Sequence, residues 1–211
     1  MDAFETIRSN LVGANAVYRS PFGLRRVIYA DYVASGRPLA QVEKLLQERV
    51  MPFYANTHTE DSFTGARTTH LAQESGDYIK QCLGARDYKI IFCGSGSTAA
   101  IKRMQEILGV AVTSNLREKL LPHLKPEERP VVFVGPYEHH SNEVTWRESL
   151  AEVVEIPLDE HGGVNLAVLE AALADQVWGS RIRIGSFSAA SNVTGILTDT
   201  GNFTFSATSE R

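Results

Sequence analysis

The feature that most constrains this chain is a short apolar run that leads into a turn of glycine and hydroxyl residues. Residues 89–101 read Lys-Ile-Ile-Phe-Cys-Gly-Ser-Gly-Ser-Thr-Ala-Ala-Ile, a pattern that predicts a strand, a turn and the start of a helix. Glycine adopts positive φ without strain, and the first free N–H groups of a helix favour an anion in such a turn. The turn Gly94–Thr98, called the glycine cup below, therefore fits a phosphate as well as it fits a plain strand-to-helix turn with an N-cap. No Gly-Lys-Ser/Thr follows it, so the cup is not a nucleotide P-loop.

Composition and charge narrow the classes of partner. The 211 residues carry 21 basic and 25 acidic side chains, a formal net charge of −4, and 43% of them are apolar. Well-mixed charges argue against a nucleic-acid footprint or a polybasic membrane patch, and the apolar fraction is enough for a packed core. Two cysteines without a CxxC pair, an acidic start at Met1–Glu5 and no apolar run of membrane-spanning length predict a cytoplasmic protein with no membrane among its partners.

Helical and strand-like patterns alternate along the chain. Apolar residues at helical spacing predict helices over residues 2–18, 38–50, 71–83, 99–108, 143–150 and 166–177. Short branched or alternating apolar runs predict strands over residues 26–32, 89–92, 131–134, 153–158 and 181–187. Because this alternation is typical of βαβ units, we expect an α/β fold with a mostly parallel sheet covered by helices.

Polar segments follow three of the predicted strands. The glycine cup follows Phe92, Glu-His-His-Ser-Asn at 138–142 follows the strand 131–134, and Ser-Asn-Val-Thr-Gly at 191–195 follows the strand 181–187. Ligands of open α/β sheets bind at the carboxyl ends of the strands. We therefore expect these three segments to converge on one site.

A zinc site is one interpretation of the histidines His58, His70, His139 and His140. Zinc takes three or four ligands, but adjacent histidines at a strand exit rarely point the same way. The chain has neither His-Glu-x-x-His nor a cysteine pair. We therefore predict no metal.

A dinucleotide site is a minor alternative, because residues 94–99 match G-x-G-x-x-A after a strand. That fold places an acid at the end of the next strand, about twenty residues on. Here the corresponding residues 114–118 are polar and unpatterned, and the next clear strand starts only at Val131.

A pyridoxal 5'-phosphate (PLP) site accounts for more of these residues. Gly96, Ser97 and Thr98 can supply the helix N-terminus and hydroxyls that a phosphate needs, His139 a flat partner for the ring, and Asn192 a donor to the phenolic oxygen. Catalysis would further require an acid beside the pyridinium nitrogen and a lysine that forms the Schiff base.

The order of these segments resembles class V aminotransferases of the cysteine desulfurase type. The segments that carry the resemblance are Tyr29–Gly36, the Asn56–Thr59 loop, the cup with its helix, Glu138–Trp146 and Ser191–Gly195. The resemblance spans about residues 29–200. It implies the large domain of a fold-type I PLP-dependent transferase, and an enzyme that acts on an amino acid such as cysteine, as a homodimer.

The resemblance also implies roles for individual residues. Ser97 and Thr98 are similar to the phosphate ligands, His139 to the residue stacked on the ring, and Asn192 to the neighbour of the phenolic oxygen. His58 lies on the loop that closes over the substrate in that family. Ser35 lies in the matching N-terminal turn near the substrate, although Tyr-Val-Ala before it departs from the more usual Asn-Ala-Ala.

Two family segments have no match in this sequence: the one that carries the pyridinium acid and the one that carries the Schiff-base lysine. None of the six lysines follows a matching motif; they are Lys44, Lys80, Lys89, Lys102, Lys119 and Lys125. No stretch matches the substrate-activating cysteine loop, and Cys93 fits a small buried hydrophobe better. We therefore predict no catalytic residue of these kinds within these 211 residues.

The last eleven residues lose the pattern of the rest. We expect an N-terminal helical arm over 1–28, a partial PLP-transferase large domain over 29–200, C-terminally incomplete, and an aberrant or disordered tail over 201–211. The chain then corresponds to the N-terminal part of such an enzyme, catalytically incomplete as given. The alternatives are a non-catalytic module that binds PLP or a phosphorylated ligand or pairs with an intact homologue, and a fragment that does not fold stably because an apolar sheet edge stays open.

Overall fold

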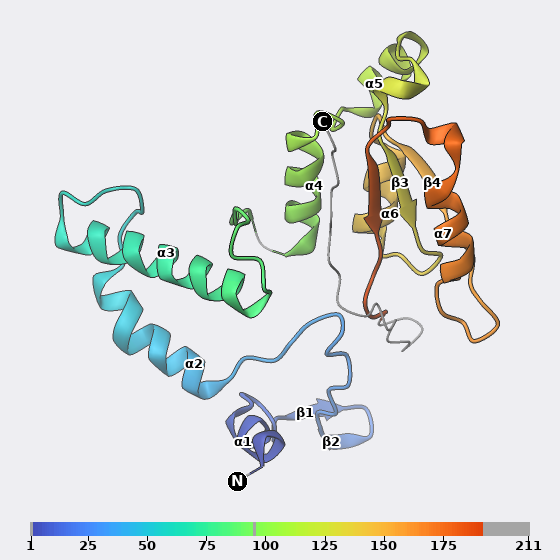
Figure 1. Ribbon diagram of the computed structural model, residues 1–211. Coiled ribbons are helices and arrows are strands. Elements are labelled where there is room, and N and C mark those ends of the chain that lie inside the picture. The colour runs from blue at the N-terminus through green and yellow to red at the C-terminus, as the bar shows by residue number, and fades with distance from the viewer. Residues whose placement is uncertain (1, 95, 192–211) are drawn as a thin grey trace. The chain divides into compact units, whose positions relative to one another are not determined.

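The computed structural model of the chain describes residues 2–94 and 96–191 (Figure 1). These residues form two compact units, one up to Ile91 and one from Phe92, called the N-terminal unit and the sheet unit below. The predicted tail over 201–211 lies outside the described residues. None of the described helices is long and apolar enough to cross a bilayer.

The N-terminal unit begins with a helix and a hairpin. Helix α1 spans Ala3–Asn10, and strands β1 (Val17–Ser20) and β2 (Gly23–Arg26) pair antiparallel. The helix predicted over 2–18 is therefore wrong beyond residue 10. The strand predicted over 26–32 is wrong beyond Arg26, where the observed strand β2 ends. The residues after that predicted helix, Ser20–Gly23, form the hairpin turn, in which Gly23 adopts φ +91° and the Ser20 hydroxyl donates to its carbonyl over 2.8 Å.

Two further helices complete this unit. Helix α2 (Ala40–Leu45) continues as a π-helical stretch over Leu46–Val50 and a 3₁₀ turn over Met51–Phe53. Helix α3 spans Phe63–Cys82 and begins eight residues before the predicted start, because Ser62 caps it by accepting the Gly65 N–H.

The sheet unit is built on three parallel strands in the order β4-β3-β5 (Figure 1). They span Val131–Val134 (β3), Glu152–Glu155 (β4) and Arg183–Ser186 (β5), and Val134 pairs with Glu155 on one side and Ser186 on the other. This confirms the α/β fold with a parallel sheet. All four residues of β3 are fully buried.

Helices α4 (Ser97–Ile107), α6 (His140–Arg147) and α7 (Leu166–Ala174) pack on the two faces of this sheet. The unit also contains helix α5 (Ser114–Leu120) and 3₁₀ turns over Leu121–His123, Pro126–Glu128 and Gln176–Trp178. Val132 and Val134 pack with Trp146 of α6 and Ile101 of α4. Val131 and Phe133 pack on the opposite face, with residues of α7. The side-chain alternation of β3 thus serves two apolar layers.

One predicted strand is absent. Residues 89–92 form no strand, and Ile91 and Phe92 are 57% and 62% exposed. The apolar run before the cup is therefore not buried as a sheet strand would be.

Candidate functional site

The glycine cup opens helix α4 in a conformation that only glycine adopts readily. Gly94 has φ +54° and Gly96, the residue before the helix, has φ +86° and ψ 175°. A Cβ on Gly94 would lie 2.5 Å from the Cβ of Ala99, so the backbone there passes against the first turn of the helix. Among the described residues no side chain caps the helix N-terminus, and Gly96, Ser97 and Thr98 are exposed. The cup thus presents N–H groups and two hydroxyl residues to an anion.

His139 stands at the start of helix α6, exposed, as its N-cap. Its Nδ1 accepts the Ser141 N–H over 3.2 Å and lies 2.9 Å from the Ser141 Oγ. Because Nδ1 accepts, the neutral ring carries its proton on Nε2. One ring edge is therefore used to hold the histidine, and the imidazole is placed at the carboxyl end of β3.

Helices α4 and α6 are tied to each other. The fully buried Gln105 of α4 donates from Nε2 to the Thr145 Oγ1 of α6 over 3.1 Å, and that hydroxyl donates to the Ser141 carbonyl over 2.6 Å. The structure therefore brings Gly96, Ser97, Thr98 and His139 into one unit on two packed helices. The predicted Asn192 lies outside the described residues.

The two predicted substrate residues belong to the N-terminal unit. Ser35 is exposed in a turn where its carbonyl accepts the Tyr29 hydroxyl over 2.6 Å. His58 is exposed and has φ +67°, the only positive φ among the described non-glycine residues. The hydroxyl of Thr69 donates to the Thr59 carbonyl over 3.3 Å and ties this loop to α3.

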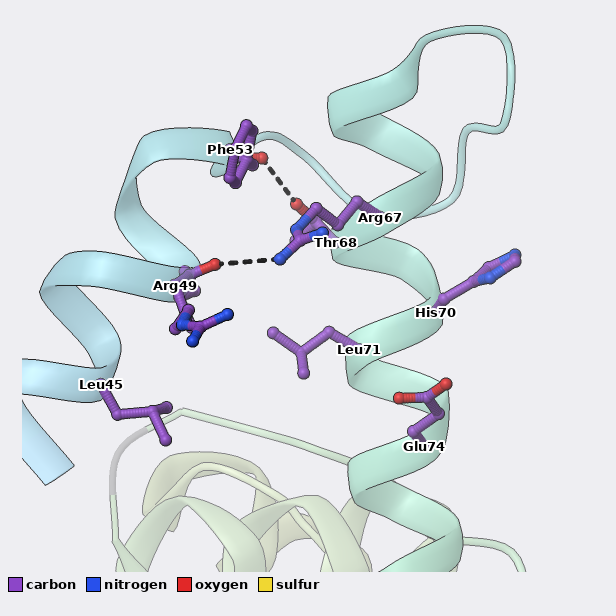
Figure 2. A pocket seen from close by; sticks show the side chains of 9 residues that line it. Leu45, Arg49, Phe53, Arg67, Thr68, His70, Leu71 and Glu74 are labelled. Carbon is purple, nitrogen blue, oxygen red and sulfur yellow. Dashed lines mark hydrogen bonds between the residues drawn. The ribbon is translucent and has the colours of Figure 1, made fainter.

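The N-terminal unit also contains a pocket of about 580 Å³ between the α2 segment and α3 (Figure 2). Its lining is Leu45, Arg49, Val50, Phe53, Arg67, Thr68, His70, Leu71 and Glu74. Arg67 stacks over the Phe53 ring at 4.6 Å and donates to the Arg49 carbonyl over 3.3 Å. Neither Ser35 nor His58 lines this pocket. The sequence did not predict it, because its residues come from two segments, 45–53 and 67–74, that only the fold brings together.

The histidines considered for a zinc site are not gathered with other metal-ligating side chains in the described part of the chain. No group of three histidine, cysteine or acidic side chains is gathered in residues 2–94 and 96–191. His70 faces Glu60 over 4.0 Å, and the rings of His139 and His140 lie 5.7 Å apart.

Two solved structures have folds similar to that of this chain and indicate its fold class. The chain is similar to the apo structure of a cysteine desulfurase from Thermococcus onnurineus NA1, with a TM-score of 0.62, 21% identity, and coverage of 94% of this chain and 43% of that one. It is also similar to the cysteine desulfurase CsdA (S-sulfonic acid) from Escherichia coli, with a TM-score of 0.52, 24% identity, and coverage of 81% and 39%. The fold is that of the fold-type I PLP-dependent transferases, and the chain spans less than half the length of either structure.

A family model identifies the chain more closely. The model of the class-V aminotransferases matches residues 28–209. The chain belongs to the class-V aminotransferase family. No curated protein matches it.

Proposed function

We propose that this protein is a PLP-dependent enzyme of the cysteine desulfurase type that acts on an amino acid such as cysteine. One observation carries the proposal. The N-terminus of α4 follows two glycines at positive φ and belongs to the same unit as the exposed His139, and α4 packs on the helix that His139 begins. A helix N-terminus suits a phosphate, and an imidazole at a strand exit suits the face of an aromatic ring.

The residues present fit this cofactor. The N–H groups after Gly96 and the hydroxyls of Ser97 and Thr98 would hold the phosphate. His139 would lie against the ring, and Asn192 would donate to the phenolic oxygen. When bound, PLP supplies an electron sink for a negative charge that develops at the α-carbon of an amino acid.

We further propose that Ser35 and His58 act on the substrate side, from the N-terminal unit. His58 suits a loop that closes over a substrate, because its backbone adopts a conformation that costs free energy in a non-glycine residue. The homodimer and the cytoplasmic location expected from the sequence are parts of the same proposal.

A second candidate is a non-catalytic module that holds PLP without a covalent link. The placement of the lysines favours it. Lys80 is half-buried and pairs with Asp77 over 2.7 Å. The others are exposed: Lys44, Lys89, Lys102, Lys119 and Lys125. None of them follows a strand of the described sheet. We propose that the 211-residue chain alone binds PLP non-covalently.

The test is a titration of the 211-residue chain with PLP, pyridoxal and NAD⁺. Binding is followed by thermal melting and by quenching of Trp146 and Trp178, which both lie in the sheet unit. PLP should bind, pyridoxal more weakly, and the double variant Ser97→Ala/Thr98→Ala should bind PLP about tenfold or more weakly, since each hydroxyl bond contributes about 1 kcal/mol. The control is Thr113→Ala, an exposed residue before α5 whose side chain does not cap that helix.

Other outcomes contradict the proposal. If PLP shifts no transition, or if the double variant and the control bind alike, the cup is not a phosphate site. Tighter binding of NAD⁺ than of PLP would favour the dinucleotide alternative. PLP fixed to one particular lysine by borohydride reduction would contradict the non-covalent form of the proposal.

A further inference from the structure

One carboxylate joins the two strand exits of the proposed cofactor site. Glu138, half-buried in the turn after β3, accepts four hydrogen bonds. Its Oε1 accepts the N–H groups of Gly135 over 3.3 Å and Ser188 over 2.8 Å. Its Oε2 accepts the Asn142 Nδ2 over 2.6 Å and the Ser188 hydroxyl over 2.7 Å. Glu138 and Ser188 are fifty residues apart in sequence and lie after neighbouring parallel strands.

The amide of Asn142 extends this link into the core. Its Nδ2 also donates to the Ser186 carbonyl over 3.1 Å, and its Oδ1 accepts the Ser186 hydroxyl and the Trp146 indole N–H. Both hydrogens and both lone pairs of the amide are thereby used, which fixes its orientation. Trp146 is fully buried. The carboxylate is consequently linked through Asn142 to a buried side chain of the sheet unit.

This network holds the chain beside His139 and the chain just after β5. His139 follows Glu138 directly and is held on its other side by Ser141. Ser188 lies four residues before Asn192. Backbone N–H groups after β3 and after β5 thus donate to one side chain.

We propose that Glu138 is a positioning residue, which sets the spacing between His139 and the segment after β5 and so the seat of the PLP ring. This inference rests on the proposed function. A carboxylate is required because all four of its partners are donors. Glutamine at this position would direct an NH₂ group at one pair of donors and leave them unpaired.

The experiment compares Glu138→Gln with Glu143→Gln in the 211-residue chain. Glu143 is a matched control, since its carboxylate lies on α6 and pairs with the exposed Arg147 over 2.9 Å. Two readouts separate the ring from the phosphate: the dissociation constant and induced circular dichroism of PLP, and the dissociation constant of inorganic phosphate. For Glu138→Gln we expect PLP to bind about tenfold more weakly with a smaller induced band, while phosphate binding stays within about twofold. Glu143→Gln should change neither.

A measurement without cofactor checks the same link. In the free chain, Glu138→Gln should accelerate hydrogen exchange at the Ser188 N–H, whereas Glu143→Gln should leave it unchanged. Ser188→Ala, which removes only the hydroxyl bond to Oε2, is the milder variant if Glu138→Gln does not fold, and it should weaken PLP binding in the same direction.

The outcomes distinguish this inference from the proposed function. Failure of the wild-type chain to bind PLP overturns both. Tight PLP binding by the wild type together with equal behaviour of Glu138→Gln and Glu143→Gln overturns only the role of Glu138. An equal loss of PLP and phosphate binding would also overturn it, because the carboxylate would then support the unit as a whole.

Discussion

The two units of the chain differ in how they bury apolar side chains. In the sheet unit, β3 is fully buried and packs against helices on both faces. In the described part of the N-terminal unit, the only buried residues are Gly65, Thr69 and Gly76. Large apolar side chains there stay open to solvent, among them Phe22 at 81% and Ile28 at 90% exposure.

The difference indicates which part of the chain holds its own shape. Burial of apolar area is the main favourable term in folding, so the sheet unit carries most of the stability that these contacts provide. The proposed cofactor residues Ser97, Thr98 and His139 belong to that unit. The proposed substrate residues Ser35 and His58 belong to the unit without an apolar core, which suits segments that move when a substrate binds.

The strongest test of this comparison is Phe133→Ala. Phe133 is fully buried, and its ring lies edge-on to Trp178 at 6.1 Å. Its truncation should cost about 3 to 5 kcal/mol of unfolding free energy. The exposed Phe22→Ala should stay within about 0.5 kcal/mol. Urea unfolding followed by tryptophan fluorescence measures the first, and circular dichroism the second. Similar losses for both variants would show that the two units do not differ in this way.

A second test addresses the close packing around Gly65 at the start of α3. A Cβ on Gly65 would collide with the Thr59 Cγ2 and lie 2.9 Å from the Ser62 Oγ, which caps the helix. Gly65→Ala should therefore destabilise α3 by about 1 to 3 kcal/mol. At Gly36 no atom lies within 4 Å of an added Cβ, so Gly36→Ala is the control and should be neutral or slightly stabilising.

The two spectroscopic signals make this second test specific. Both tryptophans lie in the sheet unit, so Gly65→Ala should shift the transition seen by circular dichroism and leave that seen by tryptophan fluorescence unchanged. A shift of both transitions together would mean that the units unfold as one.

The sequence predicted the parts of the fold whose signals are local. The branched run at 131–134 is a buried strand, and the helices at 99–108 and 166–177 lie close to the observed α4 and α7. The hairpin was missed because Val17 fits both a helical and an alternating pattern, and only the φ of Gly23 selects the turn. The prediction of a strand at 89–92 is wrong, because an apolar run does not by itself specify whether it will pair with the strands of a sheet.

In the candidate site, too, local features can be proposed from the sequence, whereas contacts between distant segments cannot. The sequence alone points to the cup and His139 as candidate site residues, since each depends on a few consecutive residues, and their roles stay predictions. The bonds from Glu138 to Ser188 could not be predicted, because they depend on the register that places Val134 beside Ser186. Glu138 appears in the sequence only as the residue before a histidine pair.

The smallest expected change in unfolding free energy comes from removing one ion pair in each unit. Arg181 of the sheet unit has a side chain only 5% exposed, and it donates to Glu152 over 2.7 Å and to the Arg129 carbonyl over 2.7 Å. Glu152→Gln should cost about 1 kcal/mol of unfolding free energy, because a nearly buried guanidinium loses its charged partner and keeps its carbonyl bond.

The matched pair in the N-terminal unit is Arg8–Glu5 of α1, whose two side chains are well exposed and lie 2.9 Å apart. Glu5→Gln should change the unfolding free energy by less than about 0.5 kcal/mol. Urea unfolding at low and high salt measures both, and only the exposed pair should weaken strongly with salt. An effect of Glu5→Gln as large as that of Glu152→Gln would mean that burial does not distinguish the two units.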